Sequence, residues 1–325
     1  MKQYLFTGAA FVVLLSSCAS LSKSQVEAVN QFAQTSKNFS AYPSKVVTSL
    51  ADLNAKRSLY YINGLIDPED LNYSNEEDDD LIDSLREQTV IQHVLEIDKV
   101  AAAKRKSYAA SESVDISFKI IDKYIQALLL LSSDKHAAGL GDQAKNFGVS
   151  LESLITTYNA MPETKKVKTG IGGFIGSLVM AGGKQWIRAK QAAQIKKFIP
   201  EADEMVAIMT SNLLQFLKSG GIDSLILKEK FGIQDSYRKF LRYRKPVVQN
   251  ERDYFEFTND IDHIETLRAQ TIAATENLRA AHGQLVVEIK EKKTLTEAIA
   301  AVQTLYEDVK EVRTTITALN TNTKN

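Results

Sequence analysis

Proline and glycine are scarce in this chain, and the apolar residues between them recur at the spacing of an α-helix. The 325 residues include 5 prolines and 15 glycines. Proline removes a backbone donor and disfavours helix at the residue before it, so the five prolines separate stretches that are each free to form helix. No series of short alternating runs between turn signals points to β-strands. We therefore predict an all-α fold, an elongated antiparallel helical bundle. The prolines are Pro43, Pro68, Pro162, Pro200 and Pro246.

The end of the chain carries the most regular pattern. From Ile264 onward the inward positions alternate in steps of three and four, which is the spacing of a helical seam. A second run follows with one irregular step, and Thr294-x-x-Glu297 between them has the form of a capping box. These features predict helices over 255–289 and 295–320, joined as a coiled-coil-like αα-hairpin. The predicted inward residues are Leu267, Thr271, Ala274, Leu278, Ala281 and Leu285, then Leu295, Ile299, Val302, Tyr306, Val309, Val312, Ile316 and Leu319.

Three further helices are predicted in the middle of the chain. Ser74-x-x-Glu77 has the form of a capping box ahead of the first. The second, over 114–131, is apolar on two faces, which predicts a position central to the bundle. The third, over 206–216, is expected to end at Gly220-Gly221, because glycine suits the left-handed end of a helix. Their inward residues are Leu81, Leu85, Ile91 and Leu95; Val114, Phe118, Ile121, Ile125 and Leu128 with Ile116, Ile120 and Tyr124; and Val206, Met209, Leu213 and Phe216.

The first eighteen residues have the order of a secretory leader. Lys2 precedes an uncharged, mostly apolar run from Tyr4 to Leu15, and Cys18 is the only cysteine in the protein. A charged start, an apolar stretch and small residues before the cleavage site define a signal peptide. The run is shorter than the ~20 residues that a membrane-spanning helix needs, which disfavours a transmembrane anchor. Leu15-Ser16-Ser17-Cys18 resembles the lipobox of bacterial lipoproteins, which directs lipid attachment to the cysteine and cleavage just before it.

The resemblance implies an anchor and a location. Cys18 becomes the lipidated first residue of the mature protein, acyl chains hold it on a lipid bilayer, and no cysteine remains for a disulfide. Ala19-Ser20-Leu21-Ser22 lacks the aspartate that retains enteric lipoproteins at the inner membrane, which implies an outer-membrane lipoprotein facing the periplasm. The predicted organisation is a signal peptide over 1–17, a lipidated N-terminus and tether over 18–24, a helical body over 25–250, and the C-terminal hairpin with a short polar tail over 251–325.

One segment departs from the helical pattern. Residues 169–183 contain six glycines and no charge, while the surrounding 164–200 carry eight positive residues and no acidic one. One interpretation is a tightly packed helix, because Gly173, Ser177 and Ala181 form a small-residue face that lets two helices approach closely. Another is contact of 169–187 with a bilayer, because an apolar face flanked by tryptophan and cations suits anionic lipid. The membrane-contact candidates are Phe174, Leu178, Lys184, Trp186 and Arg188.

The membrane interpretation resembles, in arrangement only, the helical pore-forming toxins of the cytolysin A type, which hide apolar inserts inside a bundle. The 15 uncharged residues make about 22 Å of helix, short of the ~30 Å hydrocarbon core, so a simple span is disfavoured. The positions of the glycines and of Gln185 do not match the motifs of a phosphate-binding loop. The third glycine of a dinucleotide fingerprint falls at Gly176 instead of 175, and Gln185 stands where a P-loop needs serine or threonine.

Two other segments are strongly charged. Nine acidic residues within 67–83 predict a solvated loop and an acidic helix start, with a latch against the basic 164–200 segment as an alternative. Residues 237–245 interleave aromatics with cations. They predict a helix that buries its aromatics while its charges reach solvent. Lipid headgroups, peptidoglycan-linked anions or an acidic partner are the alternatives.

No residue set in the sequence points to catalysis. The four histidines are scattered, and His93 with Glu96 forms only half of a bundle metal site. Cys18 is committed to lipid, and the equal numbers of basic and acidic residues, 40 of each, point to no nucleic-acid partner. We expect no enzyme, metal or cofactor. The first hypothesis of function is a membrane-anchored envelope lipoprotein that acts as an interaction or scaffold module with an envelope protein partner. The second is a membrane-active helical protein that uses 169–187. The oligomeric state stays open.

Overall fold

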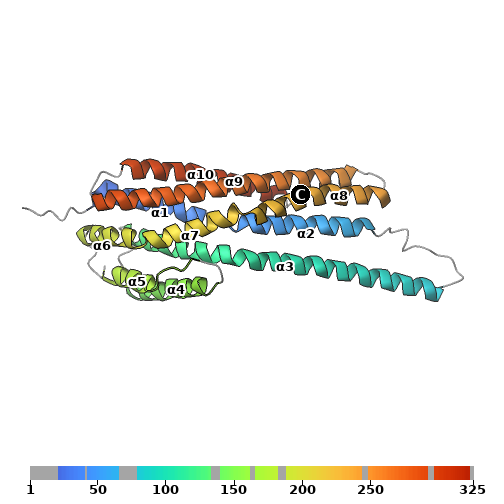
Figure 1. Ribbon diagram of the computed structural model, residues 1–325, viewed down its shortest axis with the longest axis horizontal. Coiled ribbons are helices and arrows are strands. Elements are labelled where there is room, and N and C mark those ends of the chain that lie inside the picture. The colour runs from blue at the N-terminus through green and yellow to red at the C-terminus, as the bar shows by residue number, and fades with distance from the viewer. Residues whose placement is uncertain are drawn as a thin grey trace, which may run out of the picture.

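The computed structural model describes residues 21–40, 42–65, 79–132, 140–161, 165–181, 188–243, 248–291 and 296–322. Within these ranges the chain forms helices joined by short turns and contains no strand, so the prediction of an all-α bundle is confirmed. Figure 1 shows the helices packed side by side in an elongated molecule. They are α1 (Lys23–Phe39), α2 (Lys45–Leu65), α3 (Asp79–Ser132), α4 (Leu140–Ala160), α5 (Ile171–Ala181), α6 (Arg188–Glu201), α7 (Asp203–Leu217), α8 (Gly220–Tyr243), α9 (Val248–Glu291) and α10 (Thr296–Asn322).

Helix α3 is the spine of the molecule. Its 54 residues extend about 80 Å at 1.5 Å per residue. Helices α1 and α2 follow one another along it in the opposite direction (Figure 1). Asn30 of α1 donates to Ser132 at 3.1 Å, and Tyr108 of α3 donates to Asp52 of α2 at 2.9 Å. The C-terminal half of α3 also contacts α4, α6 and α7, which is the central position that its two apolar faces predicted.

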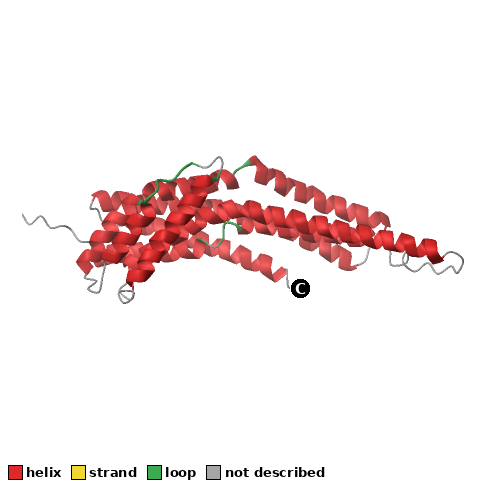
Figure 2. Cartoon of the chain, turned by 90° about the horizontal axis from the view of Figure 1, so that it is seen from below, coloured by secondary structure: helices red, strands yellow, loops and turns green. Residues whose placement is uncertain are grey.

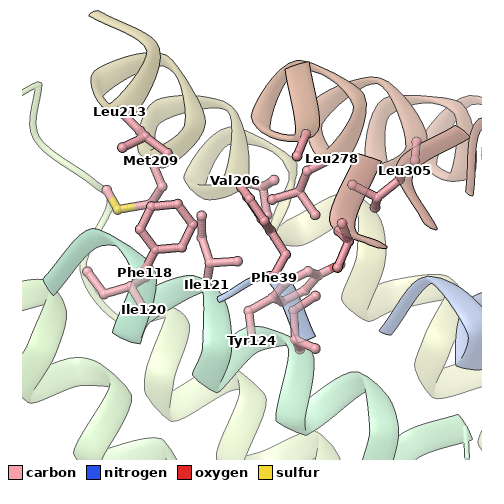
Figure 3. Close-up of a cluster of buried hydrophobic side chains, with 14 of the residues drawn as sticks. Phe39, Phe118, Ile120, Ile121, Tyr124, Val206, Met209, Leu213, Leu278 and Leu305 are labelled. Atoms are coloured by element: carbon pink, nitrogen blue, oxygen red, sulfur yellow. The ribbon is translucent and has the colours of Figure 1, made fainter. Parts of the chain in front are cut away.

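The core surrounds this half of α3. All eight inward positions predicted over 114–131 are buried. Phe118 meets Phe39 of α1 edge to face, with ring centroids 5.7 Å apart. Figure 3 shows these rings between Met209 and Leu213 of α7 on one side and Leu278 and Leu305 on the other. Side chains from five helices therefore share one apolar cluster, and each fully buried large side chain contributes about 1.5–3 kcal/mol.

The junction between α7 and α8 differs from the prediction. Helix α7 ends at Leu217, and Lys218 at its C-cap has φ −89°, so no left-handed residue ends it. Gly220 is instead the first residue of α8. Among the described glycines only Gly170 has a positive φ. A short turn through Ser219, whose carbonyl accepts from Ile222 N, takes the place of the expected glycine cap.

The C-terminal hairpin forms as predicted, with one register error. The six predicted inward positions of α9 are all buried, but Ile299 and Tyr306 of α10 are exposed. Ala298 and Leu305 are buried in their place, so at these two points the seam runs one position earlier than predicted. The start of α10 is capped from α9: the amides of Glu297 and Ala298 donate to Glu288 Oε1 at 3.1 and 3.2 Å. Thr294 of the predicted capping box lies outside the described residues, and so do Ser74 and Glu77.

Four helices continue past the rest of the bundle and form what we call the arm. The arm consists of residues 52–65 of α2, 79–108 of α3, 222–243 of α8 and 248–268 of α9. The remaining described residues are the body. Helix α10 ends part-way along the molecule, where Figures 1 and 2 mark the C-terminus, so it does not cover the outer part of the arm. Helix α1 lies at the opposite, body end.

Candidate functional site

Exposed apolar side chains gather on the arm. Thirteen of the seventeen exposed large hydrophobic side chains among the described residues belong to it, and only four belong to the larger body. Scattered single apolar residues are normal on a protein surface, but a contiguous group marks a site of contact. The four in the body are Val149, Val287, Ile299 and Tyr306. The arm is therefore the candidate interaction surface.

The first half of α3 carries the densest group. Val90, Ile91, Val94 and Leu95 are 54, 49, 50 and 45% exposed. Their spacing places them on one side of the helix. We call these four residues the α3 stripe. The residues of this stretch that are half-buried against the arm are His93, Glu96 and Val100, which lie on the other side.

Two other arm helices also present apolar side chains outward. In α8, Leu227 and Phe231 are one helical turn apart and are 53 and 68% exposed. The buried side of this helix contains Ile222, Ile226 and Ile233, so the two exposed residues lie on its outer side. In α9, Phe255 is 66% exposed, so most of its ring does not contribute to packing within the arm.

A buried charge pair holds the inside of the arm together. Glu229 of α8 accepts from Arg57 Nε at 2.9 Å and from Asn54 at 2.6 Å, both on α2. Arg57 also donates to Ser236 at 3.2 Å. The pair is satisfied from both helices, as a buried ion pair must be to avoid a large desolvation cost. A Cβ on Gly232 would lie 2.9 Å from the guanidinium carbon of Arg57, so the arginine covers this glycine.

Aromatic rings fill the outer part of the arm. Tyr60 stacks on Phe240, with ring centroids 5.1 Å apart, and meets Phe257 edge to face at 5.6 Å. Tyr237 stacks on Tyr254 at 4.6 Å. Burial raises the pKa of the Tyr60 hydroxyl well above its ordinary value. Tyr237 and Phe240 of the basic segment are half-buried in these ring contacts, as predicted, while exposed Arg238 and Arg242 reach solvent.

The glycine-rich segment packs against α4. Gly148 of α4 and Gly172 of α5 meet backbone to backbone: a Cβ on Gly172 would lie 2.7 Å from Glu152 N and closer still to Gly148 O. Glu152 accepts from the amides of Gly170 and Gly172 at 2.7 and 3.0 Å, at the start of α5. The predicted close approach of two helices is therefore present. The predicted face is wrong by one position, because Gly173 and Ser177 are exposed and the contact uses Gly172.

Of the predicted membrane-contact residues, only Phe174 has a described side chain. Phe174 is half-buried and packs against the core. Leu178 belongs to α5 and Arg188 opens α6, but their side chains lie outside the described residues, as do Lys184 and Trp186. Cys18 also lies outside them. In the described part of the chain, no helix is long and apolar enough to cross a membrane.

A buried polar chain links three helices of the body. The Tyr124 hydroxyl lies 2.8 Å from His282 Nε2, and His282 Nδ1 lies 3.4 Å from Asp203 Oδ1. Burial raises the pKa of Tyr124 well above its ordinary value. The hydrogen bond from His282 lowers the pKa of Asp203. Tyr124 and His282 are fully buried and Asp203 is partly exposed, so this chain joins α3, α7 and α9.

A small polar cavity lies where the arm meets the body. It has a volume of about 110 Å³ and is lined by α2, α3 and α10, with Lys45, Asp52 and Leu319 among its walls. Asp52 Oδ1 also pairs with Lys104 Nζ at 2.8 Å, and this contact raises the pKa of Lys104. The volume suits only a few water molecules. In the described ranges, no group of three or more histidine, cysteine or acidic residues is placed to hold a metal.

Comparisons with protein-family models, curated proteins and solved structures gave no match.

The arm itself is the feature that the sequence analysis did not predict. Ile91 and Leu95 read as core positions because their spacing is helical, but the structure exposes both. One available signal was the pair Val90 and Val94 beside them, which makes the apolar side broader than a single seam needs.

Proposed function

We propose that this protein is a membrane-anchored lipoprotein of the cell envelope that acts as a non-catalytic helical interaction and scaffold module. The observation that supports an interaction role best is the concentration of exposed apolar side chains on the arm. The resemblance of Leu15-Ser16-Ser17-Cys18 to a lipobox supports the anchor. We further propose that the membrane is the outer membrane and that the protein faces the periplasm.

The position of α1 supports an arm that points away from the anchored end. Ser22 caps α1: Gln25 N donates to Ser22 Oγ at 3.2 Å, and Ser22 N donates to Gln25 Oε1 at 2.8 Å. Cys18 is four residues before Ser22, so at most about 14 Å separates them. A lipidated Cys18 would hold the body end near the bilayer, with the arm surface toward the far end of α3, which is about 80 Å long.

Lipid labelling tests the anchor. Wild-type protein in cells fed labelled palmitate is expected to incorporate label and to fractionate with membranes, and Cys18→Ala is expected to lose both. A Cys18→Ala variant that remains acylated and membrane-bound would overturn the lipoprotein proposal. Separation of inner and outer membranes in the same experiment tests the proposed location.

Site-specific photocrosslinking in intact envelopes tests the interaction role. A photoreactive residue at Val94 or Phe231 on the arm is expected to give discrete protein adducts. The same residue at Val149, which is 65% exposed on α4 of the body, is the matched control. Adducts that form only at Val149, or at none of the three positions, would contradict an arm-based interaction role.

The alternative is a membrane-active protein that places 169–187 on or in a bilayer. The surplus of positive charge over 164–200 favours it. Trp186 is the only tryptophan, so its fluorescence reports on this segment alone. Anionic liposomes that bind a chain beginning at Ala19 and shift Trp186 emission to the blue would support this alternative. If the liposomes do not bind this chain and Trp186 emission does not shift, the alternative is excluded.

A further inference from the structure

The α3 stripe is apolar and lies on the outside of the molecule. Its four residues are about half exposed, whereas the half-buried positions beside them include the polar His93 and Glu96. An amphipathic helix normally turns its apolar side inward. Here the exposed side is the apolar one, so its sequence fits a contact outside the single chain.

The two ends of the same stretch of helix carry opposite charges, with Arg86, Glu87, Asp98 and Lys99 between them. Asp79, Asp80 and Asp83 lie in its first turns, and Arg105 and Lys106 lie after the stripe. Arg105 and Lys106 are exposed. Asp83 is eleven residues before Val94 and Arg105 is eleven residues after it. The two charged groups are therefore placed almost symmetrically about the centre of the stripe.

We propose that the α3 stripe is a homotypic interface, in which α3 of a second copy of this chain packs antiparallel across it. A twofold axis near Val94 brings the two stripes together. The same axis sets the acidic first turns of each copy beside Arg105 and Lys106 of the other. A parallel pair would place like charges side by side, which is unfavourable. The surface is self-complementary, as a twofold interface requires.

A bilayer fits this surface less well than a second chain does. The stripe is preceded by three aspartates, which anionic headgroups repel. Four half-exposed side chains per copy bury less than a standard interface of about 800 Å² per partner, so an affinity on the order of 10 µM or weaker is expected. Tethering to a membrane would raise the effective concentration and favour the pair.

This inference deepens the proposed interaction role and rests on the arm surface of that role, but not on the lipid anchor. The test therefore uses a chain that begins at Ala19, which keeps every described residue. Sedimentation equilibrium is expected to show a concentration-dependent dimer. Val94→Asp is expected to raise its Kd about tenfold or more, and Val149→Asp to leave it within about twofold. Circular dichroism confirms that each variant is folded.

A charge-reversal cycle tests the antiparallel orientation. Arg105→Glu with Lys106→Glu is expected to raise the Kd about fivefold, and Asp80→Lys with Asp83→Lys is expected to do the same. The four substitutions together are expected to return the Kd to within about threefold of wild type. Loss of affinity that the combined variant does not recover would overturn the antiparallel pairing.

A single-cysteine crosslink locates the interface. The chain from Ala19 has no cysteine, so Val94→Cys introduces a unique thiol that is expected to form a disulfide-linked dimer faster than Val149→Cys. Monomer at all concentrations, with no excess crosslinking at residue 94, would overturn the homotypic interface. If photocrosslinking at Val94 in envelopes then still captures a different protein, the interaction role stands without self-association. If neither Val94 nor Phe231 captures a protein, both proposals fail.

Discussion

Gly148 and Gly172 lie where α4 and α5 cross, and a methyl group on Gly172 would collide with the backbone of α4. Gly173 is the next residue, but a Cβ there would meet nothing within 4 Å. Two adjacent glycines in the same helix therefore have different roles, and only the packing partner distinguishes them. The small-residue pattern in the sequence predicts a close helix crossing but leaves two neighbouring faces open.

This difference predicts opposite effects of alanine at the two positions. Gly172→Ala is expected to lower the free energy of unfolding by about 1–3 kcal/mol, because the helices must move apart. Gly173→Ala is expected to raise it by about 0.5–1 kcal/mol, because alanine is the better helix former at an open position. Urea denaturation of both variants measures the difference. Equal effects would contradict the described crossing.

A second prediction at this scale concerns the buried ion pair of the arm. The side chains of Arg57 and Glu229 are only 15 and 6% exposed. Glu229→Ala leaves the guanidinium buried without its anion, which is expected to cost about 3 kcal/mol of stability. Glu96→Ala is the control. It removes the pair with Lys99 at 2.6 Å, in which the two side chains are 45 and 70% exposed, and is expected to cost less than about 0.5 kcal/mol. Similar losses in the two variants would contradict a buried pair.

Among the helices, α3 shows most clearly what local pattern can predict. Its apolar residues recur at helical spacing throughout, and the helix forms over its whole described length. Over 114–131 the predicted inward residues are buried, but Ile91 and Leu95 are exposed. Periodicity predicts which side of a helix is apolar. It does not predict whether another helix of the same chain packs against that side, because such a helix is distant in sequence.

The contact between α7 and α9 predicts a dependence of stability on pH. The hydrogen bond from His282 lowers the pKa of Asp203 below its ordinary 3.8, so the ionised form is favoured in the folded protein. The resulting stability is present above about pH 4 and is lost as the pH falls through the lowered pKa. Asp203→Asn is therefore expected to melt at a lower temperature than wild type at pH 7. The gap should narrow as the pH falls below 3.8 and through the lowered pKa of Asp203.

Thermal melts of both proteins across this pH range measure the effect. The side chain of Asp203 is 44% exposed, so solvent screening keeps the contribution below about 1 kcal/mol. A melting difference between Asp203→Asn and wild type that is constant with pH would contradict the linkage.

The whole molecule divides into a body with a deep core and an arm of four helices. The largest fully buried side chains include eight on the C-terminal half of α3 and on α4 alone, but Leu53 is the only one of them that lies in the arm. Local stability follows the density of buried apolar contacts. The arm should therefore open more readily than the body, even though α3 runs through both without a break.

Hydrogen exchange tests this division within one helix. Amides over 88–105 of α3 are expected to exchange at least about tenfold faster than those over 114–131, because opening the outer helix exposes little apolar surface. Amides over 271–285 of α9, whose inward residues are buried in the body, serve as the slow reference. Uniform protection along α3 would show that arm and body unfold as one unit.

Helical periodicity and sparse prolines determined that this chain is all-α, that residues 114–131 form a central helix and that the last two helices form a hairpin. These are consequences of local spacing, which the chain carries within each segment. Only the tertiary structure decided which glycine faces α4, which seam α10 uses, and that the apolar α3 stripe lies on the outside. Each of these depends on the position of a segment that is distant in sequence. The end of α10 part-way along the molecule, for example, leaves the outer part of the arm uncovered by this helix.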